Sequence, residues 1–205
     1  MVVSIFSYLS VWYFCNIKNN KISIQHDFKD LLFNIFSLKS YQNLDQILDR
    51  FNIRHLSEAQ KVDLNLVWHR LKPWPDAVEG LQRLRKGMMI CTLSNGNLAL
   101  LANMAKSAAL PWDLILSAET YKHYKPDPES YQGLCKTWDI EGASLLFVAA
   151  HKSDLDAAQA ATGCQTAFIV RPDEFGPEPQ ENLGREARFT YHAEGFIDLA
   201  EQLGL

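Results

Sequence analysis

Short apolar runs and longer amphipathic runs alternate from residue 88 to the end of the chain. The apolar runs have the length of buried strands, and apolar residues in the amphipathic runs recur at the spacing of a helix face. Strands that alternate with helices predict parallel βαβ units with right-handed crossovers. The predicted fold class is therefore α/β, with a doubly wound parallel sheet. The predicted strands cover 88–93, 113–119, 145–150 and 166–170, and the predicted helices cover 97–110, 127–139, 154–163 and 195–203.

Residues before Pro73 follow a different pattern. Apolar residues at helical spacing predict two amphipathic helices there, and Ser57 with Gln60 fits a capping box at the start of the second. Pro73 and Pro75 then interrupt the periodicity before a further helix begins. The three predicted helices cover 43–51, 57–71 and 75–87. We expect three parts: an atypical N-terminal segment over 1–36, a small helical unit over 37–72 and a main α/β domain over 73–205.

The first 15 residues are apolar and aromatic, and a polar stretch follows them. They are shorter than the roughly 20 residues of a membrane span, and they lack the positive start and small-residue cleavage site of a secretory signal. A β-like segment is therefore favoured over an anchor. In the next apolar stretch, 21–37, both a strand-turn-helix and a single amphipathic helix fit the pattern.

Composition narrows the class of partner. The chain has 205 residues, 47% of them hydrophobic, and a formal net charge of −4. Scattered Lys and Arg residues create no basic field for nucleic acid, so a small molecule is the expected partner, with no membrane involved. The four cysteines have no short spacing typical of zinc or redox motifs, which favours reduced thiols and a cytoplasmic protein. A homodimer is one possible assembly.

The chain is organised around the stretch 145–158, in which an apolar strand runs into a helix that starts with acidic residues. Ligands of open α/β sheets sit beyond the carboxyl ends of the strands, which is where His151 and Asp154 lie. Asp154 could position a water or orient a lysine, or it could be a helix N-terminal charge. His151 could act as an acid or base, or only as a hydrogen-bonding residue.

Two other segments place polar residues at strand ends. Ser94 and Asn95 follow the strand 88–93, where they could hold an anion at a helix N-terminus or simply form a turn and cap. Lys125 precedes Pro126 and Pro128, which stiffen the backbone and start a helix. Lys125 could neutralise a carboxylate or a developing anion, and the alternative is a solvated loop lysine.

The three segments together resemble a known family. The sequences TLSNGN, HYKPDPESY and FVAAHKSDLDAA, in this order, resemble the second, third and fourth motifs of the haloacid dehalogenase superfamily. The segments VWHRLKPWPDAVEGLQRL and TAFIVRPDEFGP make the chain look most like the type II (S)-2-haloacid dehalogenases. The resemblance covers residues 43–205 and implies a Rossmann-like core with a helical cap, part of which would be the unit over 37–72.

The resemblance also implies a reaction. In this family an aspartate at the end of the first strand attacks a short 2-haloacid, displaces halide and forms an ester that water hydrolyses. Carried over by motif, Ser94 and Asn95 would bind the substrate carboxylate or the ester oxygens. Lys125 would hold and balance the nucleophile, and Asp154 would help to position the hydrolytic water. The implied partner is a small carboxylate.

The residues near the fourth motif bear on metal use. Phosphatases of the superfamily usually have a Gly-Asp pair where this chain has Ala149 and Ala150, and alanine cannot ligate Mg²⁺. We therefore expect no metal and no cofactor, and a Mg²⁺-dependent phosphatase using Asp27 and Asp154 is the weaker alternative. The type II pattern would have a serine near Ala149 and an asparagine near His151, so the substrate range can differ.

The largest departure from the family lies at the front of the chain. No DxxGT motif occurs before residue 70, and the segment around Asp27 is the nearest approximation to one. Only 41 residues separate Asp27 from Trp68, and this short spacing predicts a truncated cap. The central strand of the sheet must then come from Val2–Tyr8 or Lys21–Gln25, and the first is favoured because it is more hydrophobic. Neither supplies an obvious nucleophile. The functional alternatives are a dehalogenase-like hydrolase and an inactive remnant that binds small anions.

Overall fold

The computed structural model describes residues 2–6, 44–46, 48–49, 52–172, 174 and 183–205. Contacts divide the described residues into two compact units. One unit joins the strand Val2–Phe6 to Leu71–Leu205, and the other contains the described residues between Leu44 and Arg70. Among the described residues, no helix combines the length and the apolar character that crossing a membrane requires.

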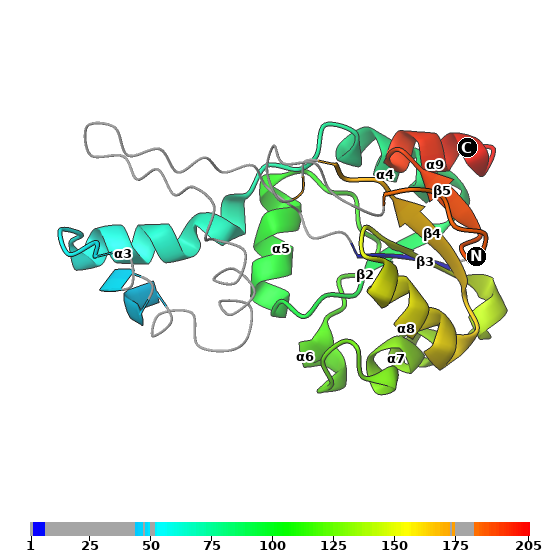
Figure 1. The fold of residues 1–205 in the computed structure, drawn as a ribbon, viewed down its shortest axis with the longest axis horizontal. Helices are drawn as coiled ribbons and strands as arrows, with labels where there is room; N and C mark the ends of the chain where they lie inside the picture. Colours follow the sequence, from blue (N-terminus) through cyan, green and yellow to red (C-terminus); the bar gives the residue numbers. More distant parts are fainter. Residues whose placement is uncertain (1, 7–43, 47, 50–51, 173, 175–182) are drawn as a thin grey trace. The chain divides into compact units, whose positions relative to one another are not determined.

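A five-stranded sheet forms the centre of the larger unit (Figure 1). Its strand order is β2-β1-β3-β4-β5, and every neighbouring pair is parallel. The structure therefore confirms the predicted α/β class and parallel sheet. The strands are β1 (Val2–Phe6), β2 (Met89–Thr92), β3 (Leu145–Ala149), β4 (Gln165–Ile169) and β5 (Tyr191–Ala193).

The N-terminal strand β1 lies inside the sheet. Ser4 is in register with Cys91 of β2 on one side and with Phe147 of β3 on the other. A strand in this position pairs the backbone groups of both neighbours, which would otherwise be unsatisfied in the core. The structure thus places the more hydrophobic candidate segment in the sheet, as expected. The other candidate, Lys21–Gln25, lies outside the described residues.

Two hydrophobic cores cover the two faces of the sheet. Alternate residues of β3 point to opposite faces, so that Phe147 belongs to one core and Val148 to the other. Helices α7 and α8 cover the face of Phe147, whereas α4 and α9 cover the face of Val148 (Figure 1). The predicted doubly wound arrangement is confirmed. The helices of this unit are α4 (Ala77–Gly87), α5 (Leu98–Ser107), α6 (Ala118–Tyr121), α7 (Pro128–Trp138), α8 (Lys152–Thr162) and α9 (Phe196–Gln202), with a 3-10 turn η2 (Gly142–Ser144).

Helices α4 and α9 approach closely at Gly80. A Cβ atom added to Gly80 would lie 2.4 Å from the Cβ atom of Phe196, so this contact requires a glycine. The guanidinium of Arg171 lies nearby and makes two hydrogen bonds to the Asp76 carboxylate, at 3.0 and 2.9 Å. The same carboxylate accepts the backbone N–H of Phe196 at 2.7 Å, which ties the start of α4 to the start of α9.

One predicted strand is wrong. The stretch 113–119 is not a strand, because only isolated bridges join Leu114 to Cys91 and Ser117 to Ser94. Leu116, Ser117 and Ala118 are buried in succession, and a short helix, α6, begins within the stretch at Ala118. Helix α4 ends at Gly87, as predicted, and Met88 follows with extended backbone.

The smaller unit contains helix α3 (Glu58–Asn65) and the 3-10 helix η1 (Leu66–Arg70). Ser57 caps α3, and the predicted capping box with Gln60 is confirmed by hydrogen bonds in both directions. The prediction of one continuous α-helix over 57–71 is wrong at its end, where the chain tightens into η1. The Lys61 ammonium lies 2.8 Å from the Asp45 carboxylate within this unit.

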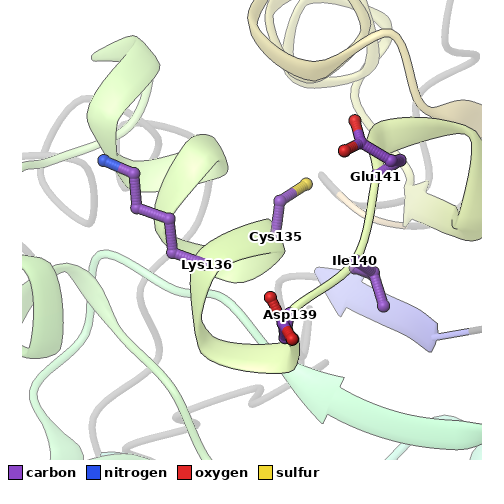
Figure 2. Close-up of a pocket in the computed structure, with 5 residues that line it drawn as sticks. All are labelled: Cys135, Lys136, Asp139, Ile140 and Glu141. Carbon is purple, nitrogen blue, oxygen red and sulfur yellow. The ribbon is translucent and has the colours of Figure 1, made fainter.

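A shallow pocket of about 260 Å³ opens at the C-terminal end of α7 (Figure 2). This end of the helix leads into η2 and the start of β3, so the pocket lies toward the amino edge of the sheet. The sequence-predicted site residues belong to the opposite, carboxyl edge. The pocket is lined by Cys135, Lys136, Asp139, Ile140 and Glu141.

Candidate functional site

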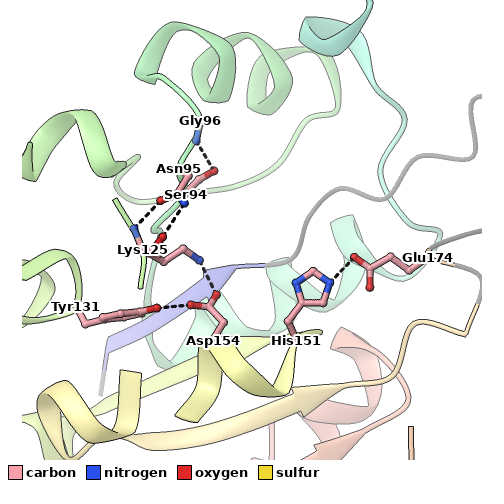
Figure 3. Close-up of polar contacts among 8 residues, drawn as sticks. All are labelled: Ser94, Asn95, Gly96, Lys125, Tyr131, His151, Asp154 and Glu174. Carbon is pink, nitrogen blue, oxygen red and sulfur yellow. Dashed lines mark hydrogen bonds and ion pairs between the residues drawn. The ribbon is translucent and has the colours of Figure 1, made fainter. Parts of the chain in front are cut away.

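Residues from three segments meet at the carboxyl edge of the sheet (Figure 3). Ser94 and Asn95 follow β2, Lys125 lies in the loop before α7, and Asp154 lies in the first turn of α8. The structure brings these four predicted residues together, because parallel strands end at a common edge and helices begin there. Asp27, considered as a metal ligand or nucleophile, lies outside the described residues.

Lys125 and Asp154 form a buried ion pair. The Nζ atom of Lys125 lies 2.5 Å from Oδ2 of Asp154, and the two side chains are 5% and 10% exposed. The ammonium also lies 5.7 Å from the centre of the Phe147 ring, which adds a cation–π attraction. Burial lowers the pKa of Lys125 to about 8, against the opposing attraction of Asp154. The alternative interpretation as a solvated loop lysine is therefore wrong.

Tyr131 holds the other oxygen of the same carboxylate. Its hydroxyl donates to Oδ1 of Asp154 at 2.6 Å, and its ring meets the Phe147 ring edge-on with centroids 5.5 Å apart. Burial, followed by the charge of Asp154, raises the pKa of Tyr131, so the phenol stays protonated and donates. Sequence reasoning missed Tyr131, although it lies in the quoted HYKPDPESY segment. The sequence signal for Tyr131 was its place on the buried face of the helix predicted over 127–139.

Asn95 is engaged with the backbone of Lys125. Its Nδ2 atom donates to the Lys125 carbonyl oxygen at 3.0 Å, and its Oδ1 atom accepts the Lys125 N–H at 2.8 Å. Ser94, which is 8% exposed, accepts the N–H of Gly96 on its Oγ atom at 3.0 Å. This is the geometry of the turn weighed as an alternative for this segment. The hydroxyl hydrogen of Ser94 can still be donated to an anion.

Protein groups also occupy the N-terminus of α5. Asn97, rather than Ser94, is its N-cap, and the Asn97 Oδ1 atom accepts the N–H of Leu100 at 2.8 Å. The carboxylate of Glu119 accepts the N–H of Leu98, also at 2.8 Å. A bound anion at this edge would therefore rely on the Ser94 hydroxyl and Lys125 more than on the amides of the helix.

His151 lies at the start of α8 and has a carboxylate neighbour. Its Nε2 atom lies 3.0 Å from Oε1 of Glu174, whose side chain is only 4% exposed (Figure 3). Glu174 lies in a turn, and the residue as a whole is half-buried. Its neighbours at 173 and 175–182 lie outside the described residues.

The described residues contain no group of three or more His, Cys, Asp or Glu side chains arranged to hold a metal ion. Ala149, at the end of β3, and Ala150 carry methyl groups, which cannot ligate a cation. What the site does offer is a buried cation, an acceptor carboxylate fixed by two donors, and a serine hydroxyl. These groups suit the binding of a small anion and the orientation of a water molecule.

Comparison with known proteins gives matches over most of the chain. Residues 16–162 match the family described as haloacid dehalogenase-like hydrolase. The chain is 32% identical over 145 residues to (S)-2-haloacid dehalogenase 1 of Pseudomonas sp. (strain CBS-3), which covers 68% of the chain and 63% of that protein. It is 35% identical over 109 residues to (S)-2-haloacid dehalogenase 4A of Burkholderia cepacia, covering 51% and 47% respectively. The chain thus spans between about half and just under two thirds of these curated relatives.

The fold is also similar to that of solved structures. Against the crystal structure of the L-2-haloacid dehalogenase PA0810 the TM-score is 0.76, with 40% sequence identity. The similarity covers 80% of this chain and 70% of that one. The present chain therefore has a fold similar to that of a solved L-2-haloacid dehalogenase.

Proposed function

The chain belongs to the family of haloacid dehalogenase-like hydrolases, as its motifs predicted, and on this premise we propose that it is a 2-haloacid dehalogenase-like hydrolase. The proposed substrate is a short 2-haloacid. The observation that carries the proposal is the buried Lys125–Asp154 pair, whose carboxylate is also held by Tyr131. A cation enclosed at the carboxyl edge favours an anionic ligand there.

The overall reaction replaces halogen by hydroxyl at C2 of the acid. A carbon–oxygen bond forms, the carbon–halogen bond breaks, halide leaves with the bonding electrons, and one proton passes to solvent. Ser94 donates to the substrate carboxylate, and Lys125 balances the negative charge that gathers at the site. Asp154, fixed by its two donors, accepts a hydrogen bond from the attacking water. By resemblance, an ester with a carboxylate of the chain would precede this water step.

Release of chloride from (S)-2-chloropropionate tests the proposal. The wild-type protein should release chloride and form 2-hydroxypropionate. Lys125→Ala should lower the rate roughly 100-fold or more, because it removes the charge that the reacting anion meets. Lys136→Ala, on the exposed surface at the far end of α7, is the matched control and should keep the wild-type rate. Absence of chloride release from the wild-type protein would contradict the hydrolase proposal.

A second candidate function is binding of a small carboxylate without turnover. It is favoured by one observation: no Asp or Glu occurs in the sequence between Phe6, the last residue of β1, and Asp27. The sequence therefore has no acidic residue directly after β1 that could act as the attacking carboxylate. Equilibrium binding of (S)-2-chloropropionate, with no chloride released over many hours, would select this function over the first.

We also propose the setting in which the protein works. The formal net charge of −4 argues against nucleic acid as a partner, and the four cysteines lack the short spacing of zinc or redox motifs, which fits the reducing cytoplasm. By analogy with the family, the helical unit over 37–72 is part of a cap, and a homodimer is the proposed assembly. Sedimentation velocity would measure the assembly directly.

A further inference from the structure

We propose that Asn95 is a positioning residue for Lys125, and that holding Lys125 is its main contribution to the site. The inference deepens the proposed function, since it assigns a role to a residue expected to bind the substrate itself. Asn95 contacts the lysine through its backbone, whereas Asp154 contacts it through its ammonium. The lysine is thus held at both ends.

The Asn95 side chain makes the two hydrogen bonds to the Lys125 backbone that a neighbouring strand makes in a sheet. Its carboxamide donates to the Lys125 carbonyl and accepts the Lys125 N–H, although 30 residues separate the two in sequence. Lys125 lies in a loop that belongs to no strand or helix. Asn95 thus satisfies both backbone groups of a half-buried residue. The carboxamide therefore fixes the loop at the residue whose side chain enters the site.

The geometry explains why this fixing matters for Lys125. The ammonium is buried against Phe147 and meets Asp154 at 2.5 Å, so the backbone that carries it must be held in place. Long lysine side chains have high conformational freedom, which a fixed backbone reduces. Ser130 of α7 donates to the His123 carbonyl at 2.7 Å, which holds a second point of the loop against the helix.

Chemical labelling of the lysines tests the role without substrate. The purified protein is treated briefly with acetic anhydride across a pH series, and acetylation of Lys125 is measured by mass spectrometry relative to the exposed Lys106. Asn95→Ala should raise the relative rate at Lys125 roughly tenfold, because losing two net hydrogen bonds opens the loop more often. Asn97→Ala is the matched control, since it removes an asparagine cap on the same loop that does not touch Lys125.

A second variant and a second readout keep the test decisive. Asn95→Asp retains nearly the same shape and an acceptor for the Lys125 N–H but loses the donor to its carbonyl. Amide hydrogen exchange at Lys125 should accelerate strongly in Asn95→Ala and less in Asn95→Asp. Unchanged labelling and exchange in both variants, with weaker binding of (S)-2-chloropropionate, would overturn the proposal and make Asn95 a substrate ligand. Both readouts are taken without turnover, so they stand even if the wild-type protein releases no chloride.

Discussion

The ammonium of Lys125 meets the carboxylate of Asp154 across 29 residues of sequence, at 2.5 Å and almost out of solvent. The contact forms because α7 and α8 both begin at the carboxyl edge of the sheet and pack on the same face. Burial disfavours the charged lysine and the aspartate favours it, and together they set the pKa of Lys125 at about 8. The first two predictions follow from that balance.

Ligand binding should weaken as the pH rises through about 8. Burial lowers the pKa of Lys125 to about 8, so the site loses its cation above that pH and attracts a carboxylate less. The affinity for (S)-2-chloropropionate, measured by calorimetry from pH 6.5 to 9.5, should fall as the pH passes about 8. Lys125→Arg keeps its charge throughout this range, so the fall in affinity should move to higher pH. An affinity that stays constant over the series would contradict the assignment.

The same shift predicts how stability depends on pH. The pKa of Lys125 is lower in the folded protein than the 10.5 of an unperturbed lysine, so the unfolded chain binds more protons between pH 8 and 10.5. This group therefore makes folding more favourable as pH rises through that window. Urea unfolding of wild type and Lys125→Met at a series of pH values should show a smaller rise in the variant. Identical slopes would mean that Lys125 titrates normally when folded.

Asp154→Asn should destabilise the folded protein by about 3 to 5 kcal/mol. The substitution leaves the buried Lys125 ammonium without its counter-charge, which costs far more than losing an exposed pair. The control is Asp156→Asn in the same helix, whose partner Arg188 lies 3.4 Å away on the surface. That change should cost no more than about 1 kcal/mol. Equal unfolding free energies for the two variants would show that the negative charge of Asp154 does not stabilise the fold through Lys125.

The position of β1 predicts the effect of a proline in it. Ser4 lies between Cys91 and Phe147, and a proline there has no N–H for either neighbour. Ser4→Pro should cost at least about 1 to 3 kcal/mol and lower the thermal midpoint by several degrees. Ser4→Thr keeps the N–H and suits a strand, so it should unfold like wild type. A proline variant as stable as wild type would place β1 outside the sheet.

The approach of α4 to α9 predicts a penalty for any side chain at Gly80. A Cβ atom there would lie 2.4 Å from the Phe196 Cβ, so the helices must separate. Gly80→Ala should destabilise the protein by about 1 to 3 kcal/mol in urea unfolding, despite the better helix propensity of alanine. Gly184→Ala, where the new methyl group meets open space, is the control. A stabilised Gly80→Ala variant would contradict this packing.

The sequence alone predicted the edge of the sheet at which the site forms, but not the hydrogen bonds between its residues. The alternation of strands and helices placed Asp154 after β3 and Ser94 after β2, and parallel topology brings such strand ends together. Lys125 reaches the same edge although the strand predicted before it forms only isolated bridges. The contact of Asn95 with the Lys125 backbone depends on side-chain packing across 30 residues. Tyr131 was missed for the same reason, because its hydroxyl meets Asp154 only when α7 packs beside α8.

The prediction of a strand over 113–119 failed because the local sequence pattern also fits other structures. The stretch 113–119 has apolar residues of the right number for a strand, yet the structure uses it for two isolated bridges and the start of α6. Tertiary contacts overrode the local pattern here, which is common for short segments.

Binding of a small carboxylate at the carboxyl edge is the claim on which the proposed functions depend. Its most direct test is an NMR titration of the isotope-labelled protein with (S)-2-chloropropionate, with propionate as the unreactive analogue. We predict that amide shifts concentrate at Ser94, Asn95 and Lys125 and disappear in Lys125→Ala. Shifts confined to the pocket of Cys135 and Glu141, or the same shifts in the variant, would contradict the account.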